Sequence, residues 1–113
     1  MNIYEPIKCI VDSVIEESPT IKTIILEPEK SFSFQAGQFI SVTVPGVGEA
    51  PFTPSSSPFI TEKLEVTVMK TGIVTGAIHM LKKGDIVGIR GPYGRAYPLD
   101  RFNGKEILLV GGG

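Results

Sequence analysis

The sequence contains little of what marks several common classes of protein. Cys9 is its one cysteine, so an internal disulfide is excluded and we expect a reducing, cytoplasmic setting. No stretch approaches the roughly 20 apolar residues that a membrane-spanning helix needs. Residues 1–5 have neither the basic start nor the apolar core of a signal peptide. What remains is the composition of one ordinary globular domain, with 42% hydrophobic and 20% charged residues among 113.

Excess charge is also absent, because the formal net charge is −1 and the sequence pI is about 5.8. A nucleic-acid-binding surface of high positive charge is therefore not expected. The charge is nevertheless unevenly distributed: residues 1–66 carry four lysines and nine acidic residues, whereas residues 67–113 carry seven basic and three acidic residues. The later part could receive an anion or an acidic partner, or the division could be a chance property of a mixed surface.

Strand patterns dominate the chain. Short segments rich in β-branched or alternating apolar residues occur at 4–17, 20–26, 38–44, 64–69 and 85–90, separated by segments with many of the 13 glycines and nine prolines. One short helix is predicted, starting at Thr75 as its cap and closing at Lys82-Lys83-Gly84. These features predict an all-β fold, a small antiparallel Greek-key barrel of about six strands with one short helix. Cys9 lies in the first strand and is predicted to be buried.

The pattern changes near residue 100. Residues 101–105 have the composition of a connector, and residues 107–110 are apolar without alternation, as in a strand that is covered on both faces. Three glycines follow. We therefore expect a barrel domain at 1–100 and, at 101–113, a linker and the first strand of a truncated α/β nucleotide-binding domain. An unpaired strand at 107–110 could also dimerise through its edge.

Three segments could carry chemistry. Residues 50–58 (APFTPSSSP) combine one aromatic ring, four hydroxyls and three prolines, which suits an edge strand that lines a groove, or equally a polar turn. Residues 70–78 (KTGIVTGAI) place a glycine and Thr75 at a predicted helix start, where free N–H groups bind phosphate, although many helix starts have this form. Residues 90–95 (RGPYGR) form a Gly/Pro segment with two cations, or only a tight turn.

In this order, the segments resemble the ferredoxin-reductase-like flavoprotein family. The family's Arg-x-Tyr-Ser flavin signature corresponds to Ala50–Thr53, its Gly-x-x-Ser/Thr-x-x-Leu phosphate motif to Gly72–Ile78, and a further match is Gly91–Gly94. Val110–Gly113 is similar to the opening of the family's nucleotide domain. The resemblance covers nearly the whole chain and is closest to electron-transfer subunits of soluble hydrogenase, anaerobic sulfite reductase or dihydroorotate dehydrogenase.

The resemblance implies a cofactor, partners and site residues. The cofactor would be FAD rather than FMN, with NAD(P)H bound only by the complete protein and with an iron–sulfur partner subunit; no cysteine cluster for iron–sulfur is present in this chain. Phe52 would lie against the isoalloxazine, with Thr53 near its N5 as the catalytic group. The remaining cofactor-binding candidates are Pro51, Ser55 and Ser56 for the ring edge or ribityl chain, Gly72, Ile73, Val74 and Thr75 for the pyrophosphate, and Lys70 as a replacement for the family's arginine.

Two departures from the signature leave alternatives open. Ala50 stands where the family has its arginine, and Phe52 replaces the tyrosine and so lacks its hydroxyl. A structural module whose flavin site has decayed is one alternative reading. The other is a non-enzymatic barrel that binds nucleic acid or protein, although few aromatic residues and the low pI argue against nucleic acid. We expect the parent protein to be a flavin-dependent oxidoreductase, and this chain alone to be inactive with NAD(P)H.

Overall fold

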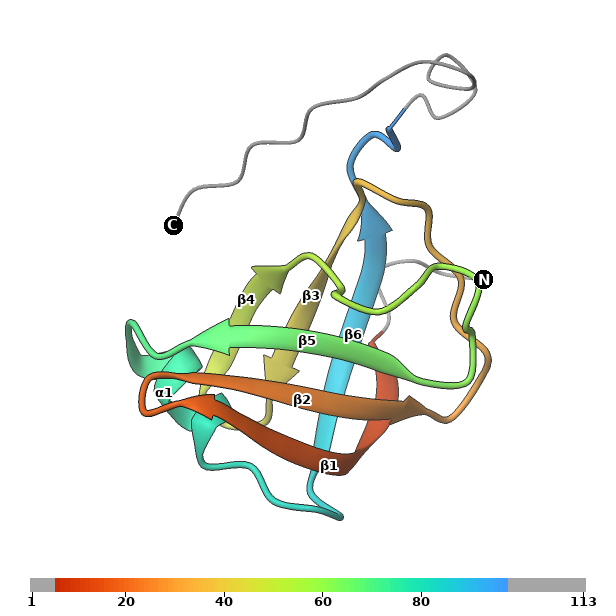
Figure 1. Cartoon of the computed structure of the whole chain (residues 1–113). Helices are drawn as coiled ribbons and strands as arrows, with labels where there is room; N and C mark the ends of the chain where they lie inside the picture. The colour runs from red at the N-terminus through yellow and green to blue at the C-terminus, as the bar shows by residue number, and fades with distance from the viewer. Residues whose placement is uncertain (1–5, 98–113) are drawn as a thin grey trace.

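A computed structural model of the chain describes residues 6–97. Its elements, labelled in Figure 1, are β1 (Ile7–Ser18), β2 (Ile21–Pro28), β3 (Phe39–Val44), β4 (Gly48–Phe52), β5 (Leu64–Met69), α1 (Ile73–His79) and β6 (Ile86–Tyr93). The predicted linker, strand and nucleotide-domain start at 101–113 lie outside the described residues. The helix of the described part has seven residues, far fewer than a membrane crossing requires.

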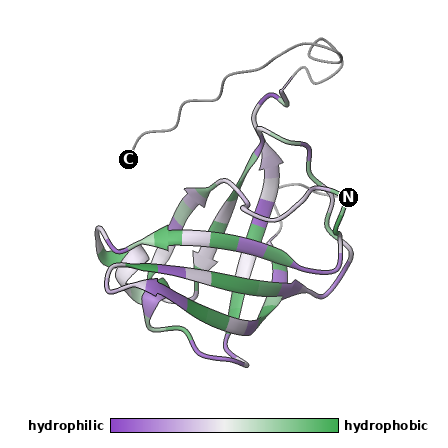
Figure 2. Ribbon diagram, viewed as in Figure 1, coloured by the Kyte–Doolittle hydropathy of each residue, from purple (hydrophilic) through white to green (hydrophobic). Residues whose placement is uncertain are grey.

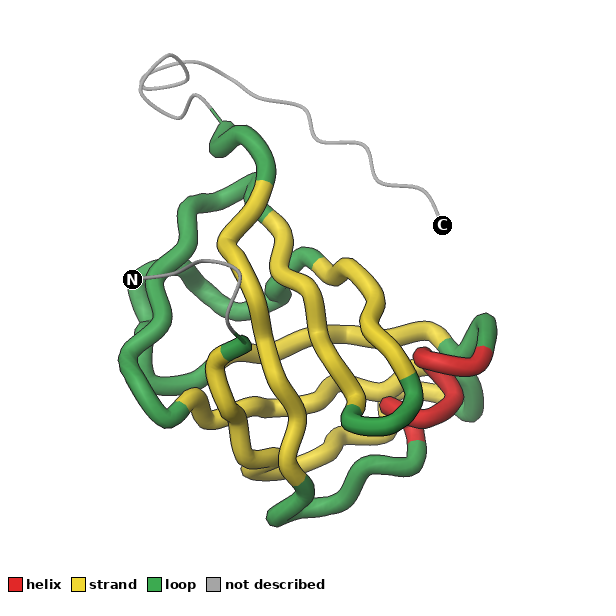
Figure 3. The backbone as a smooth tube through the Cα atoms, turned by 180° about the vertical axis from the view of Figure 1, so that it is seen from behind, coloured by secondary structure: helices red, strands yellow, loops and turns green. Residues whose placement is uncertain are grey.

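All strand pairs are antiparallel, and the sheet order is β4-β3-β6-β1-β2-β5. The neighbours β3–β6, β6–β1 and β2–β5 are not consecutive in the chain, as in a Greek-key arrangement. Figure 1 shows β1, β2 and β5 as one layer that crosses over β3, β4 and β6, and Figure 3 shows the same two layers from behind. The predicted all-β barrel of about six strands is therefore confirmed.

The core lies between these two layers. All strands except β4 contribute buried apolar side chains to it, and β4 contributes the half-buried Phe52. Figure 2 shows the apolar residues of the strands as green segments between paler or purple ones. Phe32 and Phe34, from the segment before β3, complete the cluster, and Cys9 is buried in it as predicted. Burying one such aliphatic side chain is worth about 1.5–3 kcal/mol. The buried hydrophobic core residues of the strands and the helix are Cys9, Val11, Ile24, Leu26, Ile40, Val42, Val44, Leu64, Val66, Val68, Ile78, Val87 and Ile89.

Several element boundaries differ from the sequence prediction, above all the two ends of α1 and the end of β6. The helix ends at His79, with Met80 as its C-cap, and not at Lys82-Lys83-Gly84. Gly72, not Thr75, is the N-cap of α1, so the helix starts at Ile73. Glycine is an acceptable N-cap, and the threonine hydroxyl acts from within the first turn instead. β6 does not stop before Gly91 but continues through Pro92 to Tyr93, because this stretch still pairs with the start of β3.

Candidate functional site

β4 is the edge strand that carries the aromatic-hydroxyl segment. It pairs with β3 and stands at the end of the strand order, so no strand among residues 6–97 forms a ladder with its other edge. Pro51 lacks an N–H and is compatible with a strand at such an edge. Ala50 and Phe52 lie opposite the buried Val42 and Ile40. The predicted edge strand is thus present, and its alternate residues point toward the core.

A shallow depression of about 410 Å³ opens at the end of β4, lined by Phe39, Pro51, Phe52 and Thr53. Phe52 is half-buried and packs against the core, whereas Thr53 is exposed. The depression is therefore apolar at its base and has a hydroxyl at its rim. A flat aromatic ligand with a polar edge would match both parts.

The serines that follow β4 close the barrel. The Ser55 N–H donates to the Glu65 carbonyl at 2.7 Å, and the Ser55 hydroxyl donates to the same oxygen at 3.1 Å. The Ser56 hydroxyl accepts the Glu65 N–H at 3.1 Å. These bonds join the segment after β4 to β5, the strand at the opposite end of the sheet order. Both predicted ligand-binding serines thus have a structural role in joining the two ends of the sheet.

An ion pair braces β4 on the side away from the core. An Arg90 guanidinium N–H from β6 donates to Glu49 Oε2 at 2.6 Å, and the Thr43 hydroxyl from β3 donates to the same atom at 3.0 Å. Hydrogen bonds from Arg90 and then from Thr43 hold the pKa of the Glu49 carboxyl below its ordinary value. Three neighbouring strands are therefore linked through one carboxylate.

The N-terminus of α1 is organised by Thr75. Its hydroxyl oxygen accepts the N–H groups of Thr71 and Gly72, each at 2.8 Å, while the Gly76 N–H makes the first helical bond to the Gly72 carbonyl. The N–H groups of residues 73–75 have no partner within a helix of this geometry. Within the part of the chain that the structure describes, no atom lies within 4 Å of the position that a Cβ at Gly72 would take. The first turn therefore presents backbone donors to open space, while the Thr75 hydroxyl is used by the loop.

α1 adjoins the first residue of β4, whereas the depression lies at the other end of that strand. A Cβ at Gly48 would lie 3.3 Å from Val74 Cγ2, so the helix and the strand start are in contact. Lys70 Cε lies 3.9 Å from the position of a Cβ at Gly76, which places its stem along the helix. The candidate site therefore runs along β4, from backbone donors and a lysine to an aromatic depression.

Comparison with known families identifies the domain. A sequence profile described as "Oxidoreductase FAD-binding domain" matches residues 8–97. The chain belongs to this family. FAD is the cofactor of such an oxidoreductase domain, and the match spans both β4 and α1.

Two relatives of this FAD-binding domain are electron-transfer or hydrogenase subunits. The sulfhydrogenase 1 subunit gamma of Pyrococcus furiosus is 43% identical over 89 residues, covering 77% of this chain and 30% of that protein. The probable dihydroorotate dehydrogenase B (NAD(+)), electron transfer subunit of Methanocaldococcus jannaschii is 42% identical over 110 residues, covering 96% of this chain and 38% of that protein. The chain thus spans well under half the length of either relative.

A solved structure shares the fold. The Amycolatopsis cytochrome P450 reductase GcoB aligns with a TM-score of 0.77 at 24% identity, covering 88% of this chain and 32% of that one. At this level of identity the likeness concerns the arrangement of strands. It agrees with the barrel described above.

The residues of this FAD-binding domain fit its cofactor in two places. At one end of β4, the depression offers Phe52 and Pro51 as apolar contacts and the Thr53 hydroxyl as a polar one. At the other end, the first turn of α1 offers free N–H groups without an obstructing side chain at Gly72. Ala50 contributes no charge, so the dinucleotide phosphates would depend on these backbone groups and on a lysine.

Sequence reasoning found most of these residues but missed Phe39 and the Glu49–Arg90 pair. The sequence did contain a signal for Phe39: residues 40, 42 and 44 alternate as buried positions, so Phe39 falls on the other, exposed face of the strand. The ion pair had no local signal, because its partners are 41 residues apart. The predicted residues 51–53 come together in one depression, residues 72–75 form the helix start, and the two serines lie at the barrel closure.

Proposed function

We propose that this chain is the FAD-carrying barrel of a reductase or electron-transfer subunit that passes electrons between a nicotinamide and an iron–sulfur partner. The observation that carries the proposal is the family match over residues 8–97, which includes both ends of the candidate site. FAD, when bound, supplies the redox chemistry, and the protein supplies position and polarity. The names of the two relatives, an electron transfer subunit of an NAD(+)-dependent enzyme and a hydrogenase gamma subunit, support the electron-transfer part.

We assign different parts of FAD to residues at the two ends of β4. Phe52 and Pro51 provide apolar surface for the isoalloxazine, and the exposed Thr53 hydroxyl provides a donor for its polar edge. Backbone N–H groups of residues 73–75 bind the pyrophosphate, with Lys70 as the nearby cation. The nicotinamide and the iron–sulfur partner belong to the complete protein, and residues 101–113 are proposed as the start of its next domain.

Titration with FAD and FMN tests this assignment. The chain should bind one FAD, with the binding followed by calorimetry and by the visible absorption of the bound flavin. FMN should bind more weakly, because it lacks the second phosphate and the adenosine that a site extending along β4 to α1 would contact. Absence of saturable FAD binding would overturn the proposal. Equal affinity for the two flavins would confine the site to the depression and remove the role of α1.

A further inference from the structure

Phe39 is an aromatic residue that is held in place at the surface. Its side chain is 38% exposed, yet its ring packs against the Tyr93 ring with the centroids 5.5 Å apart and the planes inclined at 41°. Gly94, at φ +87°, approaches the same ring so closely that a Cβ there would lie 3.3 Å from two ring carbons. Glycine is favoured here for both its conformation and its size. The ring is therefore fixed from two sides.

The loop that holds Gly94 is itself tied to the start of β3. The Gln38 side-chain amide donates to the Gly94 carbonyl at 3.0 Å, and the Gln35 N–H donates to the Gln38 side-chain oxygen at 2.9 Å. Phe39 also pairs with Tyr93 in the sheet. An exposed ring that is immobilised in this way loses little entropy when a ligand contacts it.

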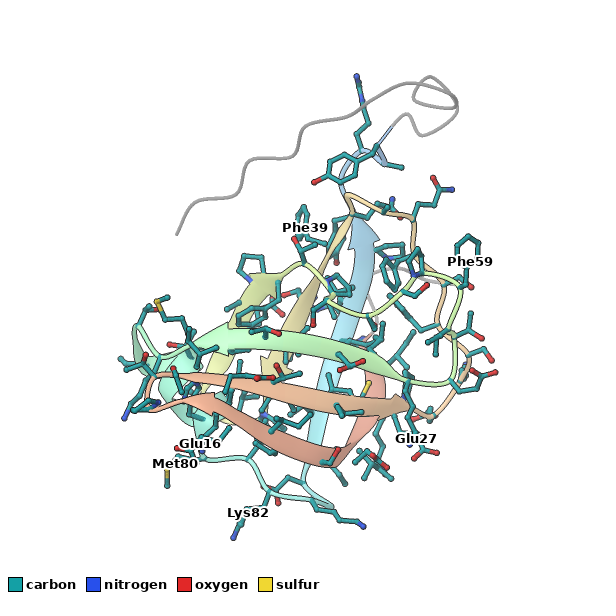
Figure 4. The ribbon with its side chains drawn as sticks, viewed as in Figure 1. Glu16, Glu27, Phe39, Phe59, Met80 and Lys82 are labelled. Carbon is teal, nitrogen blue, oxygen red and sulfur yellow. The ribbon has the colours of Figure 1, made fainter. Side chains whose placement is uncertain are left out.

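The free side of Phe39 opens on the depression beside Thr53. Ile40 pairs with Phe52 at the end of the β3–β4 ladder, and Phe39 and Thr53 are the residues just beyond this pair on the two strands. Phe39 also lines the depression with Pro51 and Phe52. Figure 4 shows Phe39 at the start of β3, near the ends of β4 and β6, and well separated from Phe59 on the loop before β5.

We propose that Phe39 is a second aromatic contact for the isoalloxazine, and that Tyr93 and Gly94 position it. The inference rests on the proposed FAD site. It also gives the Gly91–Gly94 segment a role that strand pairing alone does not require: the segment supports an aromatic ring that faces the cofactor. Phe39 and Phe52, from neighbouring strands, then both contact the flavin in the depression that Thr53 also lines.

FAD titration of F39L, with F39Y and F59L beside it, tests the contact. Loss of the ring should weaken FAD binding about 5-fold, since an aromatic stacking contact is worth about 1 kcal/mol and 1.4 kcal/mol corresponds to tenfold. F39Y keeps the ring and should bind FAD like the unaltered chain. F59L removes a ring that is 93% exposed on another loop and should also leave affinity unchanged.

Y93L and the double variant F39L/Y93L test whether Tyr93 acts through Phe39. Y93L alone should weaken FAD binding about 3-fold, as part of the stacking contact is lost when the ring is no longer held. In the F39L background the same substitution should have no further effect on affinity, because the residue it positions is gone. Unfolding temperatures without FAD identify variants that have lost structure.

Each failure has a separate meaning. If the unaltered chain binds FAD and F39L binds it equally well, the contact with Phe39 is wrong while the FAD site stands. If Y93L weakens binding to the same extent with and without Phe39, the positioning role of Tyr93 is wrong. If the unaltered chain does not bind FAD, the proposed function fails and the role of Phe39 fails with it.

Discussion

Cys9 shows how a single residue responds to its position in the core. Burial raises the pKa of its thiol from 9.0 to about 12, with a smaller contribution from the negative charge of Glu29. The neutral thiol is therefore favoured in the folded state. The contribution of the neutral Cys9 thiol to the free energy of unfolding is complete below pH 9 and is lost as the pH rises from 9 toward 12.

We predict that Cys9 will not react with a disulfide reagent at pH 8 while the chain is folded, and that one thiol will react at once in denaturant. The physical reason is that the reactive thiolate is both scarce and inaccessible. Absorbance of the released thiol product over time measures the reaction. Fast labelling of the native chain would contradict the burial of Cys9.

Thr53 allows a second prediction at the residue scale. A hydroxyl that donates a hydrogen bond to flavin N5 favours the reduced or semiquinone form of the cofactor, and Thr53→Val removes the donor with little change of shape. One hydrogen bond is worth about 1 kcal/mol, so the midpoint potential of bound FAD should become more negative by about 20 mV. A redox titration measures the potential, with Thr53→Ser as the control that keeps the hydroxyl. An unchanged potential in the valine variant would leave Thr53 with a packing role.

At the scale of elements, the start of α1 depends on one side chain. The Thr75 hydroxyl satisfies the N–H groups of Thr71 and Gly72, so it holds the loop in the form that leaves the following N–H groups open. Thr75→Ala should lower the free energy of unfolding by about 1 kcal/mol and weaken FAD binding, because the loop would no longer be held in this form. Urea unfolding and calorimetric titration measure the two effects.

Thr75→Ser keeps the hydroxyl and is the matched control for this prediction. It should bind FAD like the unaltered chain. Should Thr75→Ala match it in affinity, the pyrophosphate does not depend on the first turn of α1.

Elements also show where sequence patterns sufficed. Residues on one face predicted β1, β3 and β5, and the content of β-branched residues predicted β2; both patterns are local in the sequence. The helix start was misplaced because a threonine hydroxyl can act either as an N-cap or, as here, from inside the first turn. β6 was ended too early because Gly91-Pro92 has the composition of a turn, whereas pairing with β3 extends it.

The candidate site was also predictable where its signal is local in the sequence. Thr53 and Gly72–Thr75 belong to short motifs whose chemistry depends on neighbours in the sequence. Ser55 could not be assigned to the barrel closure, because its partner Glu65 becomes a neighbour only when the sheet curves. The fixed position of Phe39 could not be predicted either, because it depends on Tyr93 and Gly94, which lie on another strand and on the loop after it.

At the scale of the whole molecule, we expect the chain to bind FAD but not to reduce it with NADH or NADPH. It covers 30% and 38% of two relatives, so much of what those proteins contain lies beyond the aligned part. We predict that the FAD-loaded chain mixed with NADH or NADPH in a stopped-flow instrument shows no rapid, saturable bleaching of the flavin, whereas dithionite bleaches it fully. Rapid bleaching with either nucleotide would mean that a complete nicotinamide site exists within these 113 residues.

The closure of the barrel differs from its other strand junctions. Elsewhere neighbouring strands are paired by a backbone ladder of several residues, but the ends of the sheet meet through Ser55, Ser56 and Glu65. Such a junction can open without breaking a strand pair, so its local opening free energy should be well below that of global unfolding. A dinucleotide that contacts both β4 and α1 would bridge this junction and make its local opening rarer. Bound FAD would then stabilise the closed form of the barrel that binds it.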